Sequence, residues 1–152
     1  MLVIVLLASV SFAAETYHAR VVGITDGDTV KVLHEGSQIK IRLYGIDTPE
    51  KRQAFGNKAK QFTAGRVAGK VVTIIPMDRD RYGRTVALIQ SQDVSGTLNE
   101  ALVRYGYAWV YRKYCKADFC PDWLTHEQSA RSDGRGLWAD PNPIPPWQFR
   151  KK

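Results

Sequence analysis

The chain has 152 residues, of which 44% are hydrophobic and 24% are charged. This composition is typical of one folded domain and excludes a largely disordered chain. The formal net charge is +7, and the whole excess lies between residues 40 and 84, where eleven Lys or Arg face four Asp or Glu. A basic segment attracts polyanions, nucleic acid first and an anionic membrane second, although a solvated surface explains it equally well.

The first thirteen residues, Met1 to Ala13, form an apolar run that ends in small residues. A membrane-spanning helix takes about 20 residues, so residues 1–13 are better explained as a secretory signal, with Ser11 and Ala13 before the cleavage site. No Lys or Arg precedes the run, and a truncated start or an uncleaved anchor remain alternatives. We therefore expect a secreted or periplasmic protein, with a mature chain from about Ala14 and no stable membrane association.

Five strands and three helices are predicted downstream of this run. The strands rest on β-branched residues and alternating apolar positions, and the helices on apolar spacing and end signals such as the Thr97/Glu100 capping box. The predicted strands cover residues 17–24, 29–34, 38–44, 70–76 and 85–90, and the predicted helices cover residues 57–68, 98–105 and 121–132. The polar loop 78–84 between the last two strands holds three arginines.

The second and third strands are expected to form a hairpin with its turn near Gly36. Antiparallel pairing then places Asp28 opposite about Tyr44, so that Asp28 and Asp47 lie at the same open end. Alternation along the third strand leaves Arg42 and Tyr44 on its polar face, so Arg42 is expected to point outward, two or three residue lengths from the acidic end.

Five short strands with helices late in the chain predict an α+β protein, a five-stranded β-barrel with about three α-helices. An OB-type barrel is the leading candidate and an SH3-like barrel the alternative. The domain is predicted to span residues 14–139. The proline-rich tail at 140–152 is expected to be an irregular strap that packs Trp147 on its own domain, with a peptide ligand for a partner as the alternative.

Two cysteines, Cys115 and Cys120, agree with export into an oxidising compartment. A disulfide between them would close a small loop and stabilise the fold by about 2 kcal/mol. Without nearby histidines the pair makes a poor zinc site. We therefore predict that the two cysteines form a structural disulfide.

The candidate chemistry centres on Asp47-Thr-Pro-Glu50, a stiff segment in which Pro49 fixes the relation of two carboxylates. Taken alone, this pattern is more typical of a turn. With Asp28, however, it supplies two carboxylates and a carbonyl, a hard-oxygen site that suits Ca²⁺ completed by water and a phosphate. Glu50 would orient or deprotonate the attacking water, and Arg42 and Arg84 would hold a phosphodiester.

Five motifs in this order resemble those of the staphylococcal (micrococcal) nuclease, or thermonuclease, family, over residues 17–138. They are Asp26-Gly-Asp-Thr29, Arg42, Asp47-Thr-Pro-Glu50, Tyr82-Gly-Arg84 and Asn99-Glu-Ala-Leu-Val-Arg104. The resemblance implies an OB-fold, Ca²⁺-dependent endonuclease that acts on DNA and RNA and leaves 3′-phosphates. We expect it to act as a monomer.

The resemblance also implies roles for individual residues. Ca²⁺ would be bound by Asp28, Asp47 and the Thr48 carbonyl. Glu50 would be the general base or position the water, and Arg42 and Arg84 would bind the phosphate, with Arg84 assisting the leaving oxygen. Arg81 and Tyr82 match a Lys-Tyr pair that contacts the terminal phosphate of a nucleotide. A further nucleotide contact falls to Tyr111 or Tyr114, with Tyr111 preferred.

Two features depart from the family pattern. The segment between Glu50 and the first helix is shorter than in the family prototype, and the segment bounded by the two cysteines is not part of that pattern.

Three other functions are open from the sequence. A catalytically inactive OB-fold module that binds nucleic acid is the main alternative, and a scaffold in the cell envelope or in conjugation is another. A histidine-based metal nuclease is disfavoured because His18, His34 and His126 are isolated in the sequence. The complete set of acids and arginines favours the active nuclease over the inactive module.

Overall fold

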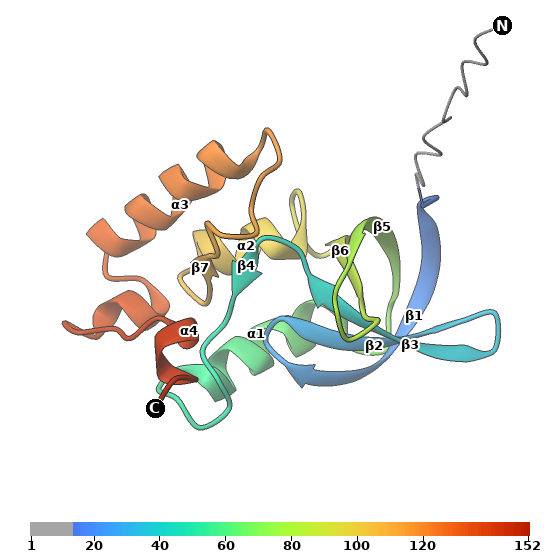
Figure 1. The fold of residues 1–152 in the computed structure, drawn as a ribbon, viewed down its shortest axis with the longest axis horizontal. Helices are drawn as coiled ribbons and strands as arrows, with labels where there is room; N and C mark the ends of the chain where they lie inside the picture. The colour runs from blue at the N-terminus through green and yellow to red at the C-terminus, as the bar shows by residue number, and fades with distance from the viewer. Residues whose placement is uncertain (1–13) are drawn as a thin grey trace, which may run out of the picture.

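The computed structural model of the chain describes residues 14–152, and the predicted signal sequence at 1–13 lies outside the described residues. The body of the molecule is a closed five-stranded β-barrel flanked on one side by helices (Figure 1). The barrel strands are β1 (Tyr17–Asp26), β2 (Thr29–His34), β3 (Ser37–Leu43), β5 (Val71–Arg79) and β6 (Thr85–Gln90). The predicted α+β barrel of the OB type is therefore confirmed.

The remaining elements form the helical side of the molecule and a small second sheet. The helices are α1 (Gly56–Val67), α2 (Leu98–Arg104), α3 (Cys120–Ser132), the 3₁₀ helix η1 (Gly136–Ala139) and α4 (Pro146–Phe149). A two-stranded antiparallel sheet joins β4 (Ile46–Asp47) to β7 (Trp109–Val110). Within residues 14–152, none of the helices has both the length and the apolar character that crossing a membrane requires.

The barrel closes through two pairings between distant strands. Strands β1, β2 and β3 form an antiparallel meander, and β5 pairs with β6 as an antiparallel hairpin. Strand β5 then pairs antiparallel with β1, and β6 pairs parallel with β3. In the β2–β3 hairpin Thr29 faces Arg42, and the Leu43 N–H donates to the Asp28 carbonyl at 2.8 Å. Asp28 therefore lies opposite Leu43, one residue from the predicted partner Tyr44. It lies at the end of the hairpin where it was expected.

Alternating residues of the strands fill the barrel. Fully buried aliphatic side chains such as Val30, Ile41 and Ile74 line the interior, and each contributes roughly 1.5–3 kcal/mol relative to an exposed position. Tyr44, predicted on the polar face, is instead 9% exposed. The chain turns at Gly45, whose φ is +71°, and the Tyr44 hydroxyl accepts N–H bonds from Lys116 and Ala117, which satisfy its polar end in the interior.

Helix α2 begins as predicted, because the Thr97 side chain accepts the N–H of Glu100 at 3.1 Å. Its buried Asn99 ties the helix to the barrel by donating to the carbonyls of Tyr44 and Ala87. The predicted disulfide between Cys115 and Cys120 is present. It packs under Gly45, where an added Cβ would lie 2.8 Å from the Cys115 sulfur.

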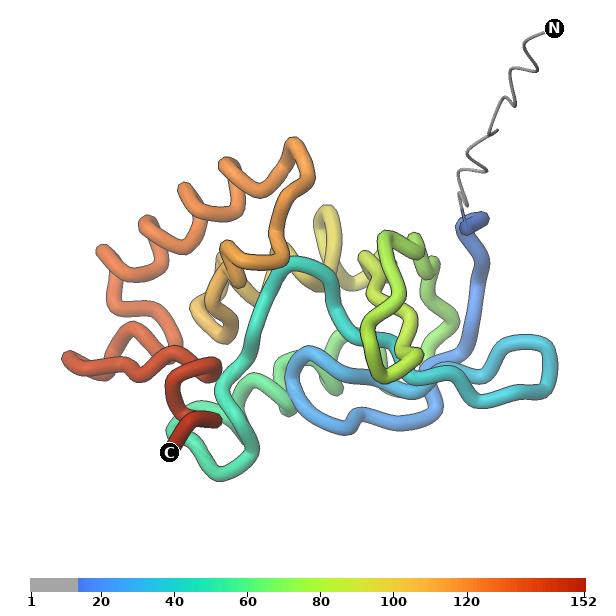
Figure 2. Tube along the Cα trace, in the orientation of Figure 1, coloured from blue at the N-terminus to red at the C-terminus, as the bar shows by residue number. Residues whose placement is uncertain are grey.

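The predicted C-terminal strap packs on the domain, but it is less irregular than expected, since residues 146–149 form the short helix α4. The Trp147 ring stacks on Tyr111 with 4.9 Å between ring centroids and meets the edge of Trp109 at 5.6 Å. This aromatic contact places the last residues of the chain beside the loop that follows β4, as the Cα trace shows (Figure 2).

Candidate active site

The acidic turn between β1 and β2 is pressed against helix α1. A Cβ added at Gly27 would lie 2.8 Å from the Ala59 Cβ and 2.9 Å from the Thr48 hydroxyl, so only glycine fits there. The Thr63 hydroxyl of α1 donates to the Gly27 carbonyl at 2.5 Å. This close packing explains the Asp-Gly-Asp-Thr motif, because it turns Asp28 inward, where it is 5% exposed.

Asp28, Asp47 and Arg42 form one buried group. Asp47 is 1% exposed, and Arg42 bridges the two carboxylates, with Nη1 at 3.3 Å from Asp28 Oδ2 and Nη2 at 3.2 Å from Asp47 Oδ1. The same guanidinium donates to the carbonyls of Leu43 and Ile46, both at 3.0 Å. The predicted convergence of the two aspartates is thus observed. Arg42 alternates with the buried Ile41 and Leu43, as expected for an outward-pointing residue, but its guanidinium reaches both aspartates instead of ending two or three residue lengths away. Arg42 turns toward the carboxylates because they and the two carbonyls satisfy the donors of its two terminal nitrogens.

Burial and neighbouring charges shift the pKa values of the acids. Burial alone would raise the pKa of Asp28, but Arg42, Asp26 and the Thr48 N–H, which donates at 2.8 Å, hold it below its ordinary value. Burial raises the pKa of Asp47, although Arg150 and Arg42 oppose the shift. Burial and the charge of Asp28 raise the pKa of Asp26 to about 7. The site therefore contains closely spaced carboxylates that repel one another and need cations.

Glu50 lies at the rim of this group, with its side chain 36% exposed. Its backbone N–H donates to the Gln53 side chain at 3.1 Å, and the Gln53 N–H donates back to the Glu50 carbonyl at 2.8 Å. The loop after Glu50 is so tight that a Cβ on Gly56 would lie 2.0 Å from the Glu50 carbonyl oxygen. The short segment noted in the sequence is therefore a compact, hydrogen-bonded loop.

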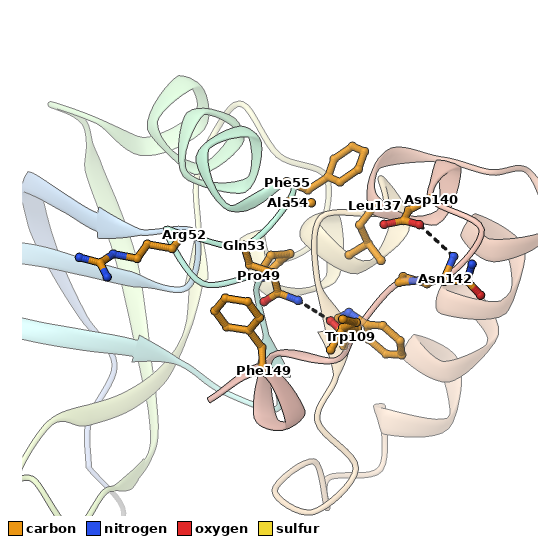
Figure 3. Close-up of a pocket in the computed structure, with 12 residues that line it drawn as sticks. Pro49, Arg52, Gln53, Ala54, Phe55, Trp109, Leu137, Asp140, Asn142 and Phe149 are labelled. Atoms are coloured by element: carbon orange, nitrogen blue, oxygen red, sulfur yellow. Dashed lines mark hydrogen bonds between the residues drawn. The ribbon is translucent and has the colours of Figure 1, made fainter. Parts of the chain in front are cut away.

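The C-terminal segment closes over this loop. Gln53 donates to the Ile144 carbonyl at 2.5 Å, and a pocket of about 170 Å³ remains between the two segments. Figure 3 shows Pro49 and Gln53 on one side of the pocket and Phe149 approaching from α4. Phe149 directly precedes Arg150, so this packing delivers an arginine to the rim of the site.

Arg150 is the site residue that sequence reasoning missed. Its Nη1 donates to Glu50 Oε1 at 2.6 Å and to Asp47 Oδ1 at 3.1 Å, and its Nη2 donates to Asp47 Oδ2 at 2.8 Å. An arginine in a proline-rich tail is ordinary, so nothing in the sequence marked Arg150 itself as a site residue. The Trp147 side chain, which anchors the strap, was the useful clue.

The helical side of the molecule holds Asp47 in position. Strand β4 pairs Asp47 with Trp109 of β7, and the Tyr111 N–H donates to the Gly45 carbonyl at 2.8 Å. Glu127 of α3, which is 4% exposed, accepts the Val110 N–H at 2.6 Å. Asp47 is thus held by the β4–β7 sheet, which α3 supports, while Asp28 is held by the β1–β2 turn, which packs on α1, and by the Thr48 N–H.

Arg84 lies in the loop between β5 and β6. Its Nε donates to Asp80 Oδ2 at 2.6 Å. Among residues 14–152, this contact is the only ion pair that Arg84 makes. Arg84 stands two residues before Val86, which pairs with Arg42, so the loop emerges beside the buried group. Arg81 and Arg84 flank the Tyr82 ring, which is 70% exposed. These three residues form a cationic and aromatic group on the β5–β6 loop.

The two candidate tyrosines differ in their surroundings. The Tyr111 ring is held between Trp147, on which it stacks, and the edge of Tyr114 at 4.8 Å. Tyr114 is 55% exposed and lies against Lys113. Tyr111 is therefore packed between neighbouring rings in the structure, and Tyr114 presents more of its surface to solvent.

The oxygen donors suit a hard divalent cation. Asp28 and Asp47 already flank one cationic group, the Arg42 guanidinium, and carboxylate oxygens are the ligands that Ca²⁺ prefers. In the part of the chain from residue 14 onward, no three His, Cys, Asp or Glu side chains are gathered closely enough to hold a metal. A metal site here would therefore need the Thr48 carbonyl as well as the two aspartates.

Comparison with known proteins identifies the family. The family model described as staphylococcal nuclease homologue matches residues 40–140. A protein of Escherichia coli O157:H7 named "Uncharacterized endonuclease" is 40% identical over 135 residues, which cover 89% of this chain and 86% of that protein. The "Micrococcal nuclease" of Shigella flexneri is 37% identical over 155 residues, with 97% and 88% covered. An "Uncharacterized endonuclease" of Haemophilus influenzae is 42% identical over 134 residues, with 88% and 72% covered.

The matched region contains Arg42, Asp47, Glu50 and Arg84, and the first of these relatives are covered over most of their own length. With the OB-type barrel and the buried pair of aspartates, these matches show that the chain belongs to the staphylococcal nuclease family and is a nuclease that hydrolyses phosphodiester bonds.

Proposed function

We propose that the protein is a secreted or periplasmic endonuclease that uses Ca²⁺ to hydrolyse both DNA and RNA and leaves 3′-phosphate ends. The observation that carries the proposal is the buried pair Asp28 and Asp47, bridged by Arg42 and placed beside Glu50. The name of the Shigella relative, micrococcal nuclease, supports the same activity. The basic segment at 40–84 supplies the positive surface that a polyanionic substrate needs.

Asp28, Asp47 and the Thr48 carbonyl would hold the Ca²⁺ ion. When bound, the ion supplies positive charge that neutralises the phosphate and lowers the energy of the transition state. Asp28 and Asp47 are almost fully buried, and hydrogen bonds from the Thr29 hydroxyl and the Thr48 N–H fix the orientation of the Asp28 carboxylate.

The side chains around the carboxylates divide the remaining work. Glu50, at the exposed rim, accepts the proton of the attacking water or orients that water. Arg42 and Arg84 hold the phosphate oxygens and stabilise the negative charge that develops in the transition state. In this proposal Arg84 assists the leaving oxygen, while Arg81, Tyr82 and Tyr111 contact the nucleotide.

The signal-like run at 1–13 and the disulfide between Cys115 and Cys120 support an oxidising location outside the cytoplasm. In this proposal the mature chain starts near Ala14, acts as a monomer and does not associate stably with membranes.

The test is digestion of denatured DNA and of RNA by the purified mature domain, with Ca²⁺ and then with excess chelator, followed by typing of the product ends. We expect cleavage that requires Ca²⁺ and leaves 3′-phosphates. Glu50→Gln should lower kcat by about 10²–10⁴-fold with a modest change in nucleotide binding. A Glu50→Gln activity within tenfold of wild type would remove Glu50 from the mechanism. Binding without cleavage by the folded wild-type domain would favour the inactive binding module instead.

A further inference from the structure

Arg150 occupies the acceptor positions of the residue that the proposed calcium site needs. A carboxylate has two oxygens and about four lone-pair positions. Asp47 Oδ1 accepts from both Arg42 and Arg150, and Asp47 Oδ2 accepts from Arg150. Ca²⁺ binds carboxylate oxygens directly, so the ion and both guanidinium groups compete for the same atoms.

The charges of the site lead to the same conclusion. Three carboxylates, those of Asp28, Asp47 and Glu50, face the two guanidinium groups of Arg42 and Arg150. A bound divalent ion would place two further positive charges beside both guanidinium groups. Like charges at such short range oppose each other strongly in a partly buried site. Withdrawal of one of the two arginines would relieve this repulsion.

The contacts of the two arginines decide which one withdraws. Arg42 donates to the backbone carbonyls of Leu43 and Ile46 as well as to the carboxylates, and its side chain is only 16% exposed. Within residues 14–152, the hydrogen bonds of the Arg150 guanidinium all go to Asp47 and Glu50, and its side chain is 41% exposed. Arg150 can swing into solvent by side-chain rotation, while Trp147 keeps α4 on the domain.

We propose that Arg150 is a tethered cation that neutralises the metal-binding carboxylates in the metal-free enzyme and is displaced when Ca²⁺ binds. Arg150 thereby sets the metal affinity of the site. Arg150 also binds Glu50, the residue proposed to activate water, until the metal arrives. Binding of Ca²⁺ and release of Glu50 are therefore coupled. This inference rests on the proposed function for the identity of the metal and its ligands.

The test is direct measurement of Ca²⁺ affinity by isothermal titration calorimetry on the folded domain. If Arg150 competes with Ca²⁺, the apparent Ca²⁺ affinity equals the intrinsic affinity multiplied by the fraction of molecules in which Arg150 has left the site. We expect Arg150→Ala to bind Ca²⁺ about tenfold more tightly than wild type, and Arg150→Lys, which keeps the charge but loses the two-pronged contact, to lie in between. The matched control is Lys151→Ala, which removes the neighbouring exposed charge and should leave the affinity within twofold of wild type.

A second readout follows Arg150 itself in the wild-type protein. In nuclear magnetic resonance spectra, its guanidinium protons should be protected from exchange with water in the presence of chelator and lose that protection as Ca²⁺ is added. This measurement does not depend on enzymatic activity or on whether Arg150→Ala folds well.

The outcomes separate this inference from the proposed function. Equal, measurable affinities in wild type and Arg150→Ala would overturn the role of Arg150 and leave the calcium site standing. Weaker binding in Arg150→Ala would overturn it too, since Arg150 would then support the metal. Absence of Ca²⁺ binding in both folded proteins would overturn the calcium site and this inference together. Tighter binding in both Arg150→Ala and Lys151→Ala would mean that general charge, not the tethered contact, sets the affinity.

Discussion

Arg42 and Arg84, the two arginines proposed to hold the phosphate, are fixed in different ways. Arg42 is largely buried and contacts acceptors on three separate parts of the chain, the β1–β2 turn, the end of β3 and β4. Arg84 is held by Asp80, four residues away in the same loop. The comparison teaches that Arg42 is tied to several parts of the fold, whereas Arg84 is tied only to its own loop among the contacts of residues 14–152.

Removing Arg42 should have the largest effect on stability. Arg42→Ala leaves Asp28 and Asp47 buried without the cation that bridges them, and breaking a buried pair in this way costs about 3–5 kcal/mol. Urea denaturation in the presence of chelator measures the loss, and added Ca²⁺ should restore part of it. Arg79→Ala, an exposed arginine at the end of β5, is the control and should change stability by about 0.5 kcal/mol or less. An Arg42→Ala protein as stable as Arg79→Ala would break the comparison.

Removing Arg84 should separate activity from stability. If Arg84 holds the developing charge, Arg84→Ala lowers kcat/KM by about 100-fold, equivalent to about 3 kcal/mol of transition-state stabilisation. Its unfolding free energy should fall by less than about 1 kcal/mol, because its ion pair is local and partly exposed. Steady-state kinetics and urea denaturation on the same preparation test both halves. Near-normal turnover would assign Arg84 to the surface of the loop.

Reducing the disulfide between Cys115 and Cys120 tests whether the activity of the carboxylate site depends on the helical side of the molecule. Reduction by dithiothreitol should lower the unfolding free energy by about 2 kcal/mol and lower the melting temperature. We expect little loss of activity at 25 °C, because the hydroxyl of Tyr44 still binds the segment that contains the cysteines. A melt unchanged by the reductant, with two free thiols found by mass, would contradict the disulfide.

Asp80 should give the smallest effect, and one that depends on pH. Burial would raise the pKa of Asp80, but its hydrogen bonds and ion pair with Arg84 outweigh burial and lower it. A lowered pKa in the folded state stabilises the protein above the ordinary carboxyl pKa, and this contribution is lost as the pH falls through the lowered value. Asp80→Asn should therefore cost less than about 1 kcal/mol at pH 7 and progressively less as the pH falls below about 4. A difference that persists at pH 2 would contradict the ion pair.

Much of the fold and the acidic half of the site could be predicted from the sequence, because the information is local. Alternation located the five strands, and hairpin pairing brought Asp28 toward Asp47 within one residue of the observed register. Tyr44 was misplaced because its burial depends on two amides more than seventy residues away. Arg150 was missed for the same reason, since its contacts with Asp47 and Glu50 span a hundred residues or more.

The parallel pairing of β3 with β6 has a consequence for the order in which the protein folds. The β1–β2–β3 meander joins segments close in sequence, whereas β3 meets β6 only across a segment that includes α1 and β5. Closing a long loop costs entropy before any contact compensates, so such pairings form late. Refolding followed by both circular dichroism and nuclease assay should therefore show secondary structure first and activity afterwards. Catalytic competence then arrives with barrel closure, at the end of folding.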